Sequence, residues 1–106
     1  MTVRLTEAQF QAKIVNRAKA RGWLVHHARP APTRSGGWAT PIQGNIGFPD
    51  LVLAKQGRLV FAEVKTERGT LGEYQQEWLD ALDGEGRLVT VWRPADWPTI
   101  TELLDG

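Results

Sequence analysis

Apolar residues near the start of the chain recur at the spacing of a helix. Phe10, Ile14 and Ala18 are each four residues apart, so they share one face of an α-helix. Thr6 and Gln9 stand in the order of a capping box, in which each side chain bonds the backbone N–H of the other residue. The pattern predicts a helix that begins after Thr6 and packs this apolar face against the rest of the protein.

The remaining chain contains strand-like segments and two further helical segments. We expect strands at residues 23–27, 51–54, 59–65 and 88–92, and helices at residues 71–82 and 98–104. Residues 29–47 contain three prolines and four glycines without periodicity, which indicates a long loop. The order α, β, β-hairpin, α, β, α predicts a single α/β domain over residues 1–106.

Alternation along residues 59–65 places Glu63 and Lys65 on the same face of their strand. Asp50 stands at the start of the preceding strand, and antiparallel pairing brings the start of one strand to the end of the next. Asp50 and Glu63 are therefore expected to meet. On the helix that follows, periodicity turns Gln75 toward the sheet and its neighbour Gln76 toward solvent.

Two carboxylates and a lysine on one sheet are costly to desolvate unless they bind an ion or a ligand. A divalent cation relieves the repulsion between Asp50 and Glu63, and hard oxygen ligands select magnesium or manganese rather than zinc. Water bound to such an ion could act as a nucleophile, and Lys65 beside it could orient the water or offset negative charge on the phosphate. These are the groups needed for metal-dependent phosphodiester hydrolysis. The structural alternative for an acid and a lysine at this spacing is a cross-strand salt bridge.

Helical projection adds Glu7 to this set, because it falls in the middle of the stripe formed by Phe10, Ile14 and Ala18. A carboxylate on an inward face needs a partner, so we expect Glu7 to point toward the candidate site. The alternative is an acid at a helix start that is favoured by the helix dipole.

The composition fits one modest hydrophobic core in 106 residues. The absence of cysteine excludes disulfides and thiolate metal sites, and it suits a reducing compartment. No apolar run approaches the roughly 20 residues that span a bilayer, and no signal-peptide pattern opens the chain. We therefore expect a cytoplasmic protein without membrane contact, in a bacterial cell or a virus-infected host.

The charge distribution favours a nucleic-acid partner. Residues 1–49 hold seven basic residues and one acidic residue, whereas residues 50–106 hold six basic and eleven acidic residues. On the first helix Lys13, Arg17 and Arg21 are four residues apart and could follow a phosphate backbone, or they could form an ordinary solvated face. The loop adds three candidate contacts with DNA, which are Arg29, Arg34 and Trp38. Trp38 could stack on an unpaired base or pin the loop to the core.

The motifs in combination resemble the PD-(D/E)XK nuclease superfamily, with PD at Pro49 and Asp50 and EVK at residues 63–65. More narrowly, GFPDLVL, then FAEVK, then LGEYQQEWL before a later strand, resembles the VRR-NUC (virus-type replication-repair nuclease) family. The resemblance implies a restriction-endonuclease-like core (αβββαβ), with a mixed central sheet flanked by helices. It implies the following roles: metal ligation by Asp50, Glu63 and the main-chain carbonyl of Val64, catalysis by Lys65, support of the lysine and water by Gln75, and an outer-shell acid at Glu7.

Short standalone members of this family resemble Holliday junction resolvases that act as homodimers, so the resemblance implies branched or duplex DNA as substrate. Magnesium is the expected cofactor, and manganese is expected to support activity as well. Two alternatives stay open: a flap or nicking endonuclease that acts with a partner, and a DNA-binding module without catalysis. Phe48 and Gly72 depart from the residues expected beside these motifs, but neither position carries the chemistry.

Overall fold

The computed structural model describes residues 4–27, 31–32, 34, 36–39 and 44–106 of the chain. Its elements follow the predicted order, and a small additional hairpin, β2 and β3, interrupts the predicted long loop. The helices and strands are α1 (Glu7–Ala20), β1 (Leu24–His27), β2 (Ala31–Pro32), β3 (Trp38–Ala39), β4 (Leu51–Lys55), β5 (Arg58–Val64), α2 (Glu73–Leu82), β6 (Leu88–Trp92), the 3-10 helix η1 (Pro94–Asp96) and α3 (Trp97–Asp105).

The main sheet has the strand order β1-β4-β5-β6 and is mixed. The strands β1, β4 and β5 pair antiparallel, whereas β5 and β6 pair parallel, so the chain must cross over between them through α2. Gln56 and Gly57 both have positive φ, as required by the tight turn that joins β4 to β5. This hairpin fixes the register that aligns Leu51 with Ala62 and so sets Asp50 opposite Glu63.

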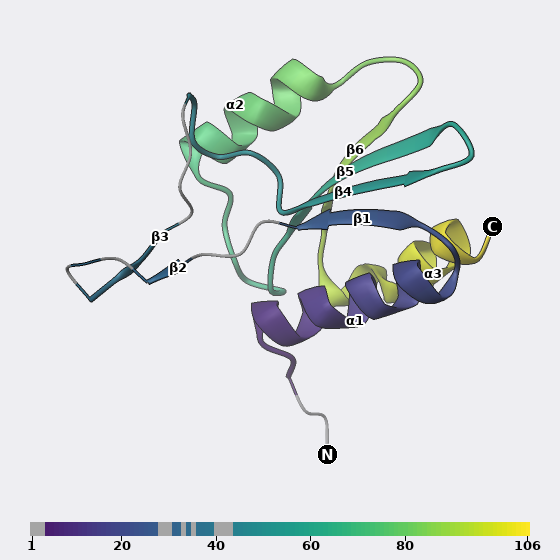
Figure 1. The fold of residues 1–106 in the computed structure, drawn as a ribbon, viewed down its shortest axis with the longest axis horizontal. Helices are drawn as coiled ribbons and strands as arrows, with labels where there is room; N and C mark the ends of the chain where they lie inside the picture. Colours follow the sequence, from purple (N-terminus) through teal and green to yellow (C-terminus); the bar gives the residue numbers. More distant parts are fainter. Residues whose placement is uncertain (1–3, 28–30, 33, 35, 40–43) are drawn as a thin grey trace.

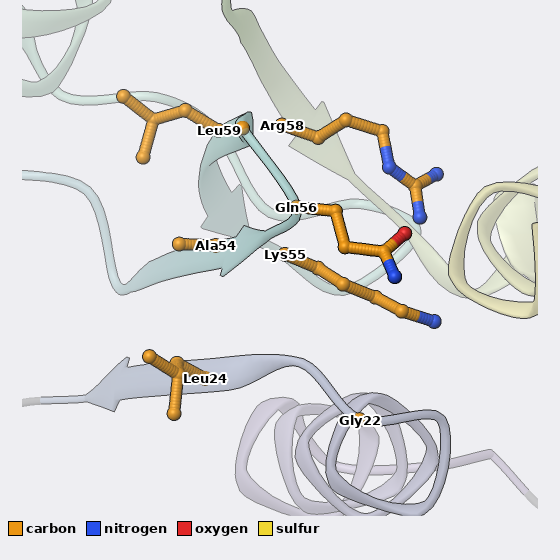
Figure 2. Close-up of a pocket in the computed structure, with 8 residues that line it drawn as sticks. Gly22, Leu24, Ala54, Lys55, Gln56, Arg58 and Leu59 are labelled. Atoms are coloured by element: carbon orange, nitrogen blue, oxygen red, sulfur yellow. The ribbon is translucent and has the colours of Figure 1, made fainter.

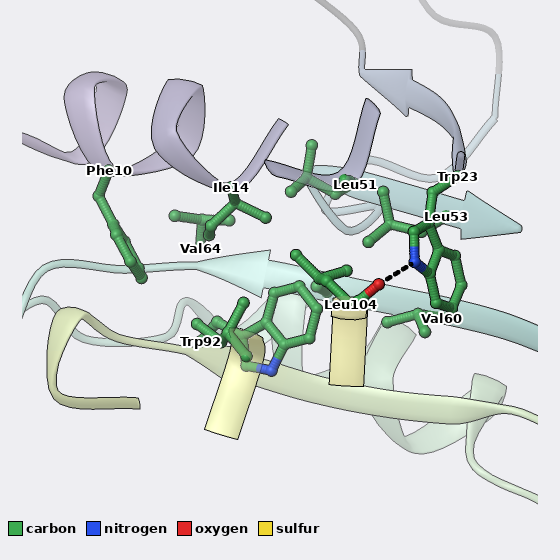
Figure 3. Close-up of a cluster of buried hydrophobic side chains, with 12 residues drawn as sticks. Phe10, Ile14, Trp23, Leu51, Leu53, Val60, Val64, Trp92 and Leu104 are labelled. Carbon is green, nitrogen blue, oxygen red and sulfur yellow. Dashed lines mark hydrogen bonds between the residues drawn. The ribbon is translucent and has the colours of Figure 1, made fainter. Parts of the chain in front are cut away.

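Helices cover both faces of the sheet, with α1 and α3 on one side and α2 on the other (Figure 1). The hydrophobic core lies between the sheet and the α1–α3 layer (Figure 3). Phe10, Ile14 and Ala18 are all buried there, which confirms the predicted apolar stripe. The α3 helix is held in the same layer by a hydrogen bond from Trp23 Nε1 to the Leu104 carbonyl at 3.0 Å. This arrangement confirms the predicted α/β class, and it is compatible with the restriction-endonuclease-like core that the family resemblance implied.

The N-terminus of α1 carries the predicted capping box. Gln9 N donates to Thr6 Oγ1 at 3.1 Å, and Thr6 N donates to Gln9 Oε1 at 2.9 Å.

In the part of the chain that the structure describes, no helix combines the length and the apolar character needed to cross a bilayer.

Candidate active site

Asp50 lies immediately before β4, at the end of the sheet opposite the Gln56–Gly57 turn. Its Oδ2 atom accepts a hydrogen bond from the backbone N–H of Val64 at 2.9 Å. This bond links the start of β4 to the end of β5, so the Asp50 carboxylate is held beside Glu63. Antiparallel pairing predicted this meeting from the sequence, and the structure confirms it.

Glu63 is buried, with 1% of its surface exposed, on the face of β5 opposite the core residues Ala62 and Val64. Gln75 Nε2 of α2 donates to its Oε1 atom at 3.3 Å, as expected for the glutamine that faces the sheet. Its Oε2 atom is buried and has no hydrogen-bond partner among the described residues. Burial and the adjacent Asp50 carboxyl raise the pKa of Glu63 to about 9, with a smaller contribution from Glu7, although Lys65 acts in the opposite direction.

The two carboxyl groups fit a divalent cation. An unpartnered buried oxygen beside a second carboxylate is unfavourable, and it is relieved either by a shared proton or by a cation that both groups bind. Among the described residues no three histidine, cysteine or acidic side chains are placed to hold a metal together. A site here would therefore combine Asp50 and Glu63 with neutral oxygens and water, a ligand set that suits magnesium. The predicted third ligand, the main-chain carbonyl of Val64, remains a prediction.

Lys65 follows β5 directly and is half-buried. Its positive charge favours the ionised form of the Glu63 carboxyl and so opposes the rise in the pKa of that group. The backbone N–H of Lys65 donates to the Trp92 carbonyl at 3.0 Å, which extends the β5–β6 pairing by one residue. The lysine is therefore placed on a continuous sheet next to the two carboxylates.

Arg93 holds the segment that follows Lys65, a role that sequence reasoning missed. Its Nη1 atom donates to the carbonyls of Thr66 at 2.6 Å and Gly69 at 2.7 Å. From the other direction, Glu67 Oε1 accepts a hydrogen bond from the backbone N–H of Ala95. The parallel pairing of β5 with β6 brings the ends of both strands to the same edge, and because this pairing is tertiary, no local pattern around Arg93 indicates its role.

Glu7 lies at the start of α1 and is exposed, so the expectation of an inward carboxylate is wrong. The buried residues of α1 begin only at Phe10, and residues 7–9 are all exposed, so the first turn of the helix is not part of the packed face. Its charge still contributes to the raised pKa of Glu63, which places it on the side of the candidate site. Its proposed role as an outer-shell acid remains a prediction.

The three basic candidates at the first helix, Lys13, Arg17 and Arg21, make contacts within the protein. Arg17 and Arg21 both bind the Asp105 carboxylate, at 2.5 Å and 2.9 Å, and Lys13 Nζ lies 4.2 Å from the ring centroid of Trp97. These contacts join α1 and the residue that caps it to α3, although Lys13 and Arg21 are still exposed.

The other predicted DNA contacts lie in or near the incompletely described loop. Arg34 is exposed, whereas Arg29 and the side chain of Trp38 lie outside the described residues. A DNA-binding role for all of the basic candidates and for Trp38 therefore stays a prediction.

A separate hollow lies at the opposite end of the sheet, around the turn between β4 and β5 (Figure 2). Leu24, Ala54 and Leu59 contribute apolar walls, and Lys55 and Arg58 stand at its edge. Lys55 Nζ donates to the Arg21 carbonyl and Arg58 Nη2 to the Gly106 carbonyl, so both side chains serve the fold. Because Asp50 stands at the other end of β4, this hollow is not part of the candidate site.

Comparison with known proteins yields one family match. The family model of the VRR-NUC domain matches residues 38–96, which is more than half of the chain. The matched region includes Asp50, Glu63, Lys65, Gln75 and also Arg93, but it excludes Glu7 and the rest of α1. No curated protein and no solved structure matches the chain.

Proposed function

Because this chain belongs to the VRR-NUC domain family, a nuclease of the PD-(D/E)XK type, we propose that it is a magnesium-dependent, structure-selective DNA endonuclease that resolves Holliday junctions. Nuclease domains of this type generally use divalent metals. The observation that carries the magnesium proposal is the buried, unpartnered Oε2 atom of Glu63 beside the Asp50 carboxylate. That pair is unfavourable without a cation and favourable with one.

Asp50, Glu63 and the Val64 carbonyl are the groups that would hold the ion. When bound, the ion supplies positive charge for the scissile phosphate and makes water a stronger acid. Lys65 is placed to orient the attacking water and to offset negative charge that develops on the phosphate. Gln75 fixes the orientation of the Glu63 carboxylate, and the Val64 N–H fixes that of Asp50. In this proposal Asp50, Glu63 and Lys65 supply the charges, whereas Gln75 and the Val64 N–H fix the orientation of the carboxylates.

Resolution of a four-way junction requires two cuts related by symmetry. We propose a homodimer for this reason, because a two-fold axis supplies two equivalent sites. Cleavage of DNA is also compatible with the proposed cytoplasmic location, in a bacterial cell or in a virus-infected host. A flap or nicking endonuclease that acts with a partner is the alternative, and it would need only one site.

Cleavage of synthetic substrates tests the proposal. The parent protein is incubated with a mobile four-way junction, a flap, a linear duplex and a single strand, with magnesium, manganese or EDTA. We expect paired symmetric nicks in the junction, and loss of these nicks in EDTA, in Asp50→Asn and in Lys65→Ala. The matched control is Asp80→Asn, since Asp80 is an exposed carboxylate of α2 that contacts only Gln76 among the contacts described.

Each other outcome points to a specific alternative. Cutting of flaps or plain duplex would retain the nuclease and discard the resolvase. Binding without cutting by the parent would indicate a DNA-binding module, and cutting that persists in Asp50→Asn would remove Asp50 from the site. Circular dichroism of both variants separates a catalytic loss from a loss of fold, because the amide oxygen introduced by Asp50→Asn can still accept the hydrogen bond from Val64 N.

A further inference from the structure

Three large apolar side chains are exposed where the segment before β4 meets the start of α2. Tyr74 is 57% exposed, Ile46 is 54% exposed and Phe48 is 43% exposed. Ile46 and Phe48 flank Gly47, and Gly47 lies directly against the backbone of Tyr74. We name Ile46, Phe48 and Tyr74 the apolar cluster. Isolated exposed apolar residues are ordinary, but three at one contact point call for an explanation.

The backbone that carries the apolar cluster is firmly held. A Cβ atom added at Gly47 would lie 2.6 Å from the carbonyl carbon of Tyr74, so the two segments are in direct contact. Trp78 Nε1 donates to the Asn45 carbonyl at 3.2 Å. The ring of Phe48 meets Trp78 edge-on, with 5.0 Å between centroids. The exposed part of Phe48 is therefore presented on a fixed support, which lowers the entropy cost of binding a flat ligand.

The apolar cluster is also tied to the candidate catalytic residues. Phe48 precedes Asp50 by two residues, and only the buried Pro49 lies between them. Tyr74 is the neighbour of Gln75, whose side chain reaches Glu63. Both chain segments that carry the apolar cluster are therefore continuous with residues of the candidate site, one with Asp50 and the other with Gln75.

We propose that the apolar cluster stacks against an unpaired or unstacked base next to the scissile phosphate, and that it thereby makes the enzyme select branched DNA over duplex. The inference rests on the proposed function. Aromatic side chains stack on any base, because every base has a π-face. In a continuous duplex every base is stacked between two neighbours, whereas stacking across a branch point is easily opened, and opening it exposes a base face that can receive Tyr74 and Phe48.

A second copy of the chain is a less suitable occupant. Aromatic residues bury about 150–250 Å² each when fully covered, and the three residues of the apolar cluster are already half-covered. The remaining area is roughly 300 Å², compared with about 800 Å² per partner in a stable interface. The area fits one or two bases better than a protein surface.

The test separates stacking from general DNA binding. Tyr74→Ser and Phe48→Leu are compared with Tyr74→Phe, which keeps the ring, and with Leu24→Ser, a matched loss of an exposed apolar residue at the far end of the sheet. We expect Tyr74→Ser to lower kcat/KM for the junction by at least about fivefold and the value for duplex by less than about twofold. Tyr74→Phe should keep the parent's ratio of kcat/KM between junction and duplex because the ring is retained. Leu24→Ser, which lies outside the apolar cluster, should cleave both substrates as the parent does.

Binding provides a readout that does not depend on cleavage. In the Asp50→Asn background, 2-aminopurine at the branch should be quenched on binding, and the added Tyr74→Ser change should restore its fluorescence. Equal losses on junction and duplex, or quenching that survives the loss of Tyr74, would overturn the inference. It is likewise overturned if light scattering shows a parent dimer that Tyr74→Ser dissociates. Failure of the parent to cut any DNA would instead refute the proposed function, and the quenching would still decide the stacking.

Discussion

Glu63 is the only polar or charged residue that is buried within the described part of the chain, and one of its oxygens lacks a partner. The protein therefore leaves a carboxyl group in a position that gives no stability by itself. Gln75 satisfies one oxygen and leaves the other beside Asp50. A residue of this kind indicates that function rather than folding determines the position, since an apolar side chain of similar size would cost less.

The raised pKa of Glu63 predicts how stability depends on pH without metal. Its pKa in the folded state is about 9, above the ordinary value of 4.5, so between these values the folded protein holds a proton that the unfolded chain has lost. We therefore expect the free energy of unfolding in EDTA to fall as pH rises through this window, by at most about 1.4 kcal/mol per pH unit. Denaturant titrations at pH 5, 7 and 8 measure it.

Two comparisons make this prediction specific to Glu63. Glu63→Gln should be more stable than the parent at pH 8 in EDTA and should lose this part of the pH dependence, because its amide does not titrate. Added magnesium should reverse the decline in the parent, since the cation replaces the proton, and it should have little effect on Glu63→Gln. A parent and a variant with parallel pH profiles would contradict the prediction.

At the scale of elements, the site depends on how the segment before β4 lies against α2. Gly47 has φ of +99° and touches the backbone of Tyr74, so a side chain is disfavoured there for two independent reasons. Pro49 and Asp50 follow immediately. Any displacement of Gly47 from α2 therefore moves a carboxylate of the candidate site.

Gly47→Ala should lower both stability and activity. We expect a loss of about 1–2 kcal/mol from the positive φ and a further ~1–3 kcal/mol from the clash with Tyr74, together with slower cleavage. Gly44→Ala is the matched control, because Gly44 also has positive φ but has no atom within 4 Å of an added Cβ. Unfolding free energies and kcat measure the difference, and equal losses in the two variants would show that the contact with α2 is unimportant.

At the scale of the whole molecule, Asp105 joins the two ends of the described chain. It accepts hydrogen bonds from Arg17 and Arg21, which lie more than 80 residues earlier. These hydrogen bonds lower the pKa of Asp105 from 3.8 to about 2, and those from Arg17 contribute more than the one from Arg21. The basic residues that suggested DNA binding thus hold α1 and α3 together on the core.

The lowered pKa predicts an acid-sensitive contact between the helices. Because the folded-state pKa lies below the unfolded value, the contribution of Asp105 is fully present above about pH 4 and is lost as pH falls toward 2. The parent should therefore be more stable than Asp105→Asn at pH 7, and the two should converge near pH 2. Thermal unfolding across this range measures it, with 1 M salt as a control that should shrink the difference at pH 7. A gap that is independent of pH would mean that Asp105 acts through packing alone.

The sequence by itself determined the elements and the meeting of the carboxylates. Periodicity is local, so the apolar stripe of α1, the alternation along β5 and the face of α2 that carries Gln75 could be derived without tertiary information. The tight turn at Gln56 and Gly57 fixes the hairpin register, and that register alone brings Asp50 to Glu63. The resemblance to the VRR-NUC family rests on these same residues.

Only the tertiary structure decided which charged groups are free and which are engaged. The pairing of Arg17 with Asp105, the hold of Arg93 on Thr66 and Gly69, and the exposure of Glu7 all depend on packing between elements distant in sequence. Periodicity assigns a side chain to a face of its own helix or strand but does not say which element covers that face. The unpartnered oxygen of Glu63 and the exposure of the apolar cluster follow from that packing.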